Sequence, residues 1–181
     1  MDYLLLVNRD NLLDRGYIPD NLVNAGSMYK KDIMIVKKVL DCFNLMKMDA
    51  KKNGYDIDIM SGYRSYDYQD KIYNKLVMEK GLNYAFRHIA QPGASEHQTG
   101  LAIDICVYRC GKCYIEHDIS EFDEVKWLHE NAYKYGFILR YPDGCEEETG
   151  YDYEPWHFRY VGDIASYIYK NKLTLEGYKR A

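Results

Sequence analysis

Two spacing patterns alternate along this chain and limit what it can fold into. In the longer segments apolar residues recur every three or four positions, as in helices, and in the shorter ones they alternate with polar residues, as in strands. The predicted helices span residues 28–53, 66–80, 120–135 and 163–170, with a last turn after Thr174. The predicted strands span residues 56–60, 101–107, 114–115, 137–140 and 156–160. Because helices alternate with hairpin-like strands, we predict an α+β fold with a central antiparallel sheet flanked by helices.

Serine and glycine residues mark the ends of the predicted helices. Gly54 stands where the first helix should end, and Ser65 and Gly81 stand at the two ends of the second. A pattern that resembles a capping box opens the third helix at Ser120-Glu121-Phe122-Asp123. These residues support the predicted boundaries.

Length and charge limit the classes of protein to which the chain can belong. A chain of 181 residues can bury one sizeable core but is short for two, so we expect one domain over residues 1–181. The net charge of −4, without any basic run, argues against a nucleic-acid partner. The apolar stretch 3–7 has no basic leader and is far shorter than the ~20 residues that cross a bilayer. We therefore expect a cytoplasmic protein without a membrane span; the alternative is an extracellular domain separated from its membrane anchor.

The cysteines do not indicate a disulfide scaffold. There are five, an odd number, which suits a reducing compartment. Cys110 and Cys113 have the spacing of half a zinc clip or of a redox pair, but no second half follows and no thioredoxin-like pattern surrounds them. We expect a hairpin tip with free thiols or a local disulfide there, and we keep a redox protein as an alternative function.

Two short segments concentrate side chains that bind metal ions. The first runs from Ser95 to Asp104 and contains His97, and the second runs from Glu154 to His157. Together they offer two imidazoles and a carboxylate, a set that suits zinc with one coordination place left for water. The helical His-Glu-x-x-His pattern of many zinc proteases is absent, so we expect a site assembled from strands and loops.

Glu154 is the candidate general base, because a carboxylate beside a metal-bound water can accept its proton. Residues three apart in a regular strand face opposite sides, so Glu154 and His157 should not converge. Pro155 cannot join an interior strand ladder, and we therefore infer an irregular start of this strand that turns Glu154 toward the metal. The other histidines lack such a pattern and are expected to be structural or solvated: His88, His117 and His129.

Arg64 and Gln69 are expected to flank the turn between a strand and a helix. The Arg64 guanidinium can bind a carboxylate through two parallel hydrogen bonds, aided by the amide of Gln69. The alternative for Arg64 is an ordinary salt bridge on the surface.

The two segments resemble those of a known family. The pattern Ser95-x-His97 to Asp104, followed by Glu154-x-x-His157, is similar to that of D-alanyl-D-alanine carboxypeptidases and dipeptidases of the VanY and VanXY type. The similarity extends over nearly the whole chain, with further matching segments at 61–65, 135–142 and 157–162.

This resemblance implies a substrate and a set of roles. It implies one Zn²⁺ ion held by His97, Asp104 and His157, with Glu154 as the catalytic base. Substrate contacts would come from Arg64, Gln69 and Ser95, and Arg64 would act in catalysis if it stabilises the oxyanion rather than the terminal carboxylate. The substrates would be peptidoglycan precursors that end in D-Ala-D-Ala, or D-Ala-D-Ala itself, as in resistance to glycopeptides such as vancomycin.

The resemblance leaves the substrate length and stereochemistry open. Some members that cleave the dipeptide carry an acidic residue where this chain has Ser61, so Ser61 favours longer peptides. The family also contains L,D-carboxypeptidases with the same metal motif. A third alternative is a non-catalytic module that keeps its zinc and binds wall peptides, although an intact Glu154 argues against it.

Overall fold

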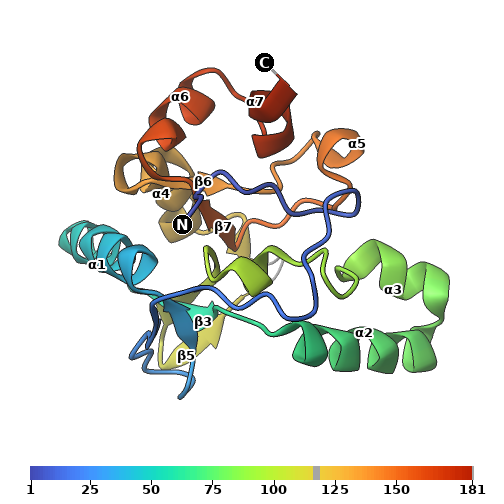
Figure 1. Ribbon diagram of the computed structural model, residues 1–181. Helices are drawn as coiled ribbons and strands as arrows, with labels where there is room; N and C mark the ends of the chain where they lie inside the picture. Colours follow the sequence, from blue (N-terminus) through green and yellow to red (C-terminus); the bar gives the residue numbers. More distant parts are fainter. Residues whose placement is uncertain (116–118, 181) are drawn as a thin grey trace.

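The computed structural model describes residues 1–115 and 119–180, and the predicted structural role of His117 falls outside these residues. The central element is a five-stranded antiparallel sheet with strand order β3-β4-β7-β6, and β5 pairs with the outer half of β4 (Figure 1). Its strands are β3 (Ile57–Ser61), β4 (Ala102–Arg109), β5 (Lys112–Tyr114), β6 (Phe137–Leu139) and β7 (His157–Tyr160). A separate hairpin joins β1 (Leu22–Asn24) to β2 (Met34–Val36). The predicted α+β fold with an antiparallel sheet is confirmed.

Helices surround this sheet. The α-helices are α1 (Lys37–Lys52), α2 (Tyr66–Lys80), α3 (Leu82–His88), α4 (Asp123–Asn131), α5 (Glu146–Thr149), α6 (Ala165–Lys170) and α7 (Leu175–Arg180). Short 3₁₀ turns include η1 (Glu96–Thr99), η3 (Ala132–Tyr135) and η4 (Gly162–Ile164). Helices α2 and α3 lie together at the end of the molecule opposite α1 (Figure 1). Among the described residues, none of the helices combines the length and the apolarity that a membrane crossing requires.

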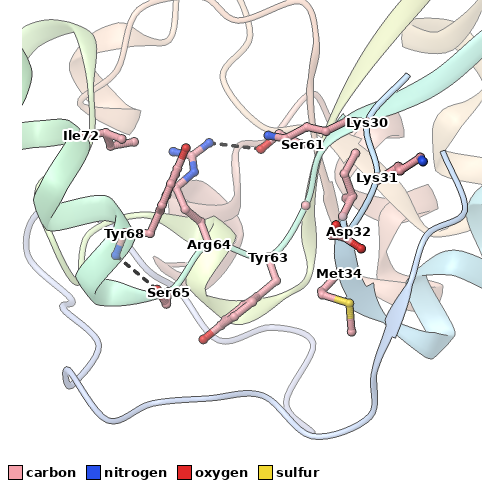
Figure 2. A pocket seen from close by; sticks show the side chains of 12 residues that line it. Lys30, Lys31, Asp32, Met34, Ser61, Tyr63, Arg64, Ser65, Tyr68 and Ile72 are labelled. Carbon is pink, nitrogen blue, oxygen red and sulfur yellow. Dashed lines mark hydrogen bonds between the residues drawn. The ribbon is translucent and has the colours of Figure 1, made fainter. Parts of the chain in front are cut away.

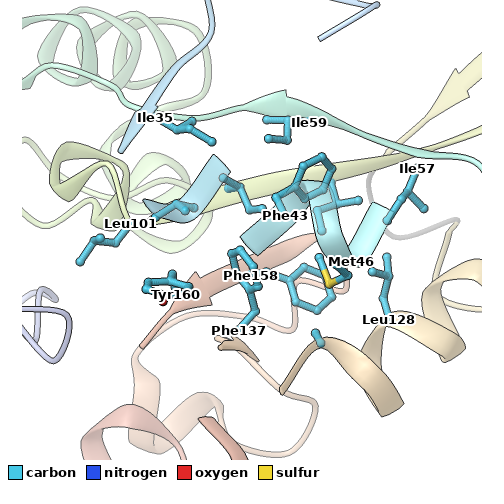
Figure 3. Close-up of a cluster of buried hydrophobic side chains, with 14 of the residues drawn as sticks. Ile35, Phe43, Met46, Ile57, Ile59, Leu101, Leu128, Phe137, Phe158 and Tyr160 are labelled. Carbon is cyan, nitrogen blue, oxygen red and sulfur yellow. The ribbon is translucent and has the colours of Figure 1, made fainter. Parts of the chain in front are cut away.

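The core lies between α1 and one face of the sheet (Figure 3). Phe43 and Met46 of α1 pack with Ile57, Ile59 and Phe158 of the strands, and all five are at most 1% exposed. Because side chains alternate across a strand, the intervening residues of β3, β4 and β7 point to the other face. That second face carries the candidate site.

The predicted helix 28–53 is wrong in its first part. Residues Met34–Val36 form strand β2, and α1 begins only at Lys37. The β-branched side chains of Ile33, Ile35 and Val36 are all buried, and they favour an extended backbone. Helical spacing alone did not separate these residues from the amphipathic helix that follows.

Helix α2 begins and ends where its signals predict. Ser65 caps it by accepting a hydrogen bond from the backbone N–H of Tyr68, and Gly81 follows its last residue. The predicted capping box does not form, because Phe122 is the N-cap of α4 and makes no side-chain cap bond. Asp123 and Glu124 instead place negative charge in the first turn, where it favours the helix dipole.

Several shorter elements differ from the prediction by one to three residues. The hairpin partner of β4 is Lys112–Tyr114 rather than residues 114–115, because Cys110 and Gly111 both adopt positive φ angles of 48° and 79° and make a tight turn. The predicted helix 163–170 begins as the turn η4 and continues as α6. The sequence patterns did not predict β1 or α3.

Candidate metal centre and active site

A row of polar side chains crosses the sheet on the face opposite the core. Ser61 of β3 and His157 of β7 are both direct neighbours of Asp104 in the central strand β4. A register irregularity between Ile59 and Ser61 ends the regular pairing of β3 at this point. The Asp104 carboxylate lies 3.1 Å from His157, measured from Oδ1 to Nδ1. Strand pairing therefore brings together two of the predicted ligands that lie 53 residues apart in sequence.

His97 reaches the same carboxylate from the turn η1. Its Nε2 atom lies 3.2 Å from Asp104 Oδ2, and its Nδ1 atom lies 2.7 Å from the carbonyl oxygen of Gly62. A carbonyl only accepts hydrogen bonds, so the Nδ1–H donates and Nε2 keeps a free lone pair directed at Asp104. His97 lies within this 3₁₀ turn, directly before the strand β4.

The three predicted ligands fit a metal ion. One donor atom from each of His97, Asp104 and His157 lies within 4.8 Å of the others, and all three residues are buried. Among the described residues, Asp104 Oδ1 and His157 Nε2 are buried without a hydrogen-bond partner. Two imidazoles and one carboxylate with an open side are a common zinc donor set.

Glu154 approaches this cluster through a turn. The N–H of His157 donates to the carbonyl of Glu154 at 3.2 Å, and the turn passes through Pro155 before β7 begins. Glu154 Oε2 consequently lies 3.5 Å from His157 Nδ1. The inferred irregular start of the strand is confirmed, and the two residues converge despite their spacing.

Charge around the cluster favours a cation. Burial alone would lower the pKa of His157, but the nearby carboxylates of Asp104 and Glu96 raise it to about 9. Burial opposes ionisation of Asp104 as well, yet the adjacent His97 and His157 hold the pKa of its carboxyl well below 3.8. Burial lowers the pKa of His97, which keeps that imidazole neutral and able to bind a metal.

The pKa of Glu154 is raised from 4.5 to about 7, chiefly by burial and in part by the charge of Asp104. His157 and Arg64 act in the opposite direction without cancelling this shift. A carboxyl group with a pKa near neutrality can both accept and return a proton.

Arg64 lies at the rim of the cluster. Its guanidinium donates to Gln69 Oε1 at 2.8 Å and to Ser61 Oγ at 3.2 Å, and it lies 3.8 Å from Asp104 Oδ2. The Gln69 amide also donates to the carbonyl of Ala90 at 2.6 Å, so both ends of this amide are already engaged. Gln69 is therefore placed to orient Arg64, and its contact with substrate stays a prediction.

A cavity of about 290 Å³ joins these groups. Its lining includes the three predicted ligands, Glu154, Arg64 and the buried Ser95. Tyr141 forms part of the wall, with its ring centroid 4.9 Å from that of His157. The structure thus brings together every predicted site residue except Gln69 and Ser61, which contact the cavity through Arg64.

The family model for VanY, described as D-alanyl-D-alanine carboxypeptidase, matches residues 32–163. The chain belongs to the VanY family. A relative from Bacillus subtilis (strain 168), YodJ, is 43% identical over 181 residues, which cover 97% of this chain and 66% of YodJ. The chain spans between about half and two thirds of the length of the first three curated relatives, with shares of 66%, 48% and 65%.

Solved structures of VanY-family proteins share the fold. The LD-carboxypeptidase LdcB is 43% identical with a TM-score of 0.91, and the match covers 97% of this chain and 84% of that one. A glutamate-to-alanine variant of the vancomycin resistance D,D-pentapeptidase VanY, in complex with Zn(II), is 33% identical with a TM-score of 0.83 and covers 99% of both chains.

The VanY-family site of this chain rests on a charged cluster that the sequence analysis missed. Glu96 is 1% exposed, and its Oε1 atom accepts hydrogen bonds from Arg140 at 2.7 Å and Arg159 at 2.6 Å. Its Oε2 atom has no hydrogen-bond partner and lies 3.6 Å from His157 Nε2. Arg140 also binds both carboxylate oxygens of Glu176 in α7. One signal was present in the sequence, because an arginine inside the aromatic strand 157–160 requires a buried counter-charge.

The other described histidines and the cysteines considered in the sequence lie outside the predicted metal cluster. His129 is mostly buried, packs on Phe158 and lies 3.1 Å from the carbonyl of Pro155, so it supports the turn before β7. His88, which was predicted to be structural or solvated, lines the cavity together with Ala90. Cys110 and Cys113 are free thiols, as are the other three cysteines.

A second hollow adjoins the cavity on the side of β2 and β3 (Figure 2). This groove has a volume of about 500 Å³ and shares Arg64 and Ile72 with the cavity. Its lining residues also include Lys30, Lys31, Asp32, Ser61, Tyr63 and Tyr68. The cavity and the groove therefore meet at Arg64 and Ile72, and we call them together the depression.

Proposed function

We propose that this protein is a zinc-dependent carboxypeptidase that removes the last D-amino acid from cell-wall peptides ending in D-Ala-D-Ala. The observation that carries the proposal is the convergence of Glu154 with His97, Asp104 and His157 in one cavity. Membership of a D-alanyl-D-alanine carboxypeptidase family supports it. A VanY relative whose structure holds Zn(II) supports the choice of metal.

His97, Asp104 and His157 would hold the zinc ion. When bound there, zinc supplies a Lewis acid that activates water and polarises a carbonyl. Glu154 accepts the proton of the attacking water at its carboxylate and returns it to the leaving amine, which its raised pKa allows. The Tyr141 ring packs on His157, and backbone hydrogen bonds at the turn through Pro155 hold Glu154 next to both residues.

Arg64 would bind negative charge on the substrate, either the terminal carboxylate or the oxyanion that develops during attack. Its bonds to Gln69 and Ser61 fix the guanidinium plane before substrate arrives. Ser95 faces the same cavity with a hydroxyl that can donate to the substrate.

Peptides longer than a dipeptide fit the shape of the depression best. Beyond Arg64 the groove offers about 500 Å³ for residues that precede the scissile bond. Ser61 places no negative charge near the position that the free amine of a dipeptide would take. A D,D-carboxypeptidase of this kind would remove the ends that vancomycin recognises, and we include a role in glycopeptide resistance in the proposal.

An L,D-carboxypeptidase is the second candidate, because LdcB, an LD-carboxypeptidase by name, is 43% identical to this chain. The test is an assay of zinc-loaded protein on three substrates. These are D-Ala-D-Ala, a pentapeptide ending in D-Ala-D-Ala, and a tetrapeptide ending in an L-to-D linkage. We expect D-Ala release from the pentapeptide, loss of all release with a chelator, and its return with zinc. Release from the tetrapeptide alone would favour the second candidate, and release from none would refute both.

A further inference from the structure

The groove beside the catalytic cavity carries a charge opposite to that of the whole protein. The chain has a net charge of −4, but three cationic side chains line the groove against one anionic side chain. The cations are Lys30, Lys31 and Arg64, and the anion is Asp32. A concave surface with excess positive charge attracts anionic ligands.

Lys30 is the cation best placed to meet such a ligand. Figure 2 shows its side chain extended across the groove toward Ser61 and the wall that bears Arg64, whereas Lys31 points away. Within the described part of the chain, the Lys30 ammonium has no hydrogen-bond or ion-pair partner. Arg64 differs, because Ser61, Gln69 and the nearby Asp104 already engage its guanidinium.

The backbone on both sides of Lys30 is held to the sheet. On one side, the N–H of Met28 donates to Asp58 at 3.1 Å, and the ring of Tyr29 packs on that of Tyr108. On the other side, the N–H of Tyr63 donates to the carbonyl of Met34 at 2.6 Å. A Cβ atom at Gly62 would lie 2.5 Å from that same carbonyl oxygen, so glycine is required for this close approach. The segment that bears Lys30 is therefore fixed relative to β3.

The two hollows also differ in the space they offer to a peptide. A carboxypeptidase must accommodate one residue after the scissile bond and the rest of the chain before it. The cavity of about 290 Å³ is also lined by His88, Ile89 and Tyr151, and the larger groove of about 500 Å³ meets it at Arg64. Because the groove is the larger hollow, we place the upstream part of the peptide in it, over Ser61 and beside Lys30, with the oxyanion at Arg64.

We propose that Lys30 forms a subsite for a carboxylate on the part of the peptide that precedes the scissile bond. This inference rests on the proposed function and names its substrate class more closely: anionic peptides. Lys30 binds without taking part in the chemistry, so it should act on substrate binding and therefore on KM. An exposed ion pair of this kind changes binding by about two- to fivefold and weakens as salt is added.

The experiment pairs variants with peptides. All peptides share the same cleavable end. In the first pair, the second residue before the scissile bond is either glutamate or glutamine. In the second pair, the third residue before the scissile bond is either glutamate or glutamine. Each is tested with the parent protein, with Lys30→Gln and with the matched control Lys31→Gln. We expect the parent to favour one glutamate peptide by about two- to fivefold in kcat/KM, through KM, at low salt. The preference should vanish in Lys30→Gln, persist in Lys31→Gln and shrink in 1 M salt.

Binding measured by calorimetry separates this inference from the proposed function. In at least one of the two peptide pairs, zinc-loaded Glu154→Ala protein should bind the glutamate peptide more tightly than its glutamine counterpart. The double variant that also carries Lys30→Gln should bind both peptides of that pair equally. If no peptide is hydrolysed but this difference is found, the subsite stands and the proposed activity fails. Equal binding of both peptides, or a preference that survives Lys30→Gln, overturns the subsite whatever the activity.

Discussion

The two sides of the predicted metal cluster are built from similar side chains in opposite surroundings. Below the cluster, Glu96 binds Arg140 and Arg159, and all three side chains are at most 1% exposed. Above it, the Arg64 and Glu154 side chains are 19% and 25% exposed. We call the buried group of Glu96, Arg140 and Arg159 the floor, and the partly exposed pair of Arg64 and Glu154 the rim.

The floor is electrically balanced and the rim is not. In the floor, two arginines meet Glu96 and Glu176, and each charge has a partner of opposite sign. In the rim, the Glu154 carboxyl has a raised pKa of about 7 and its nearest cationic contact is His157. Balanced buried charges fix geometry, whereas an unbalanced group close to solvent can exchange protons and bind ligands. Changes in the floor should therefore affect folding, and changes in the rim should affect turnover.

The largest expected effect is in the rim. Glu154→Ala should lower kcat by about 10³-fold, because a positioned general base contributes roughly 10²–10⁴-fold. Thermal unfolding and zinc content, measured on the same samples, should stay close to those of the parent. Undiminished turnover would exclude Glu154 as the base.

The next effect is in the floor. Glu96→Gln keeps the shape of the side chain but leaves two buried arginines with one carboxylate, so urea denaturation should show a loss of about 3 kcal/mol. The lost contact with His157 should also weaken zinc binding by roughly 10- to 100-fold. The control is Glu79→Gln on the exposed face of α2, which should change neither value. A Glu96→Gln protein with the stability and zinc affinity of the parent would remove the distinction between floor and rim.

A smaller effect is expected for Arg64→Lys. The charge stays but the planar pair of donors is lost, so we expect about a tenfold loss in kcat/KM with unchanged stability. Steady-state kinetics then show what Arg64 binds. A fall in kcat indicates the developing oxyanion, and a rise in KM alone indicates the terminal carboxylate.

The smallest effect at neutral pH concerns the protonation of the Glu96 carboxylate in the floor, which changes the free energy of unfolding only in acid. Burial alone would raise the pKa of Glu96, but Arg140 and Arg159 outweigh it and hold the pKa below 4.5. A carboxyl group whose folded pKa is depressed stabilises the fold above its unfolded pKa and loses this contribution as the pH falls. The free energy of unfolding should therefore decline below about pH 4.5, and less steeply in Glu96→Gln. Equal slopes for both proteins between pH 5 and pH 3 would contradict this account.

The sequence predicted the metal cluster and the rim better than the floor. Asp104 and His157 could be assigned because each lies in a short segment that concentrates metal-binding side chains, and because these segments match a known motif. The turn at Pro155 was inferred from the chemistry of proline alone. Patterns within one segment suffice in these cases, because the position of each side chain is set by the strand or turn to which it belongs.

The floor could not be assigned in this way. Glu96, Arg140 and Glu176 come from three distant segments, and no local pattern relates them. The strand β2 was misassigned for a similar reason, since its partner β1 lies across a loop and its burial depends on the sheet below. Pairing between distant segments is a property of the tertiary fold, which single-segment propensities do not contain.

The floor also ties both ends of the described chain to the metal cluster. Arg159 donates to the carbonyl oxygens of Tyr3 and Leu5, and Glu176 in α7 binds Arg140. Until α7 docks, Arg140 lacks one of its two carboxylate partners. The imidazole of His157 is then held by a floor that is still incomplete. The predicted ligand geometry is therefore complete only after α7 has folded back onto Arg140, and we expect docking of this helix to precede metal binding.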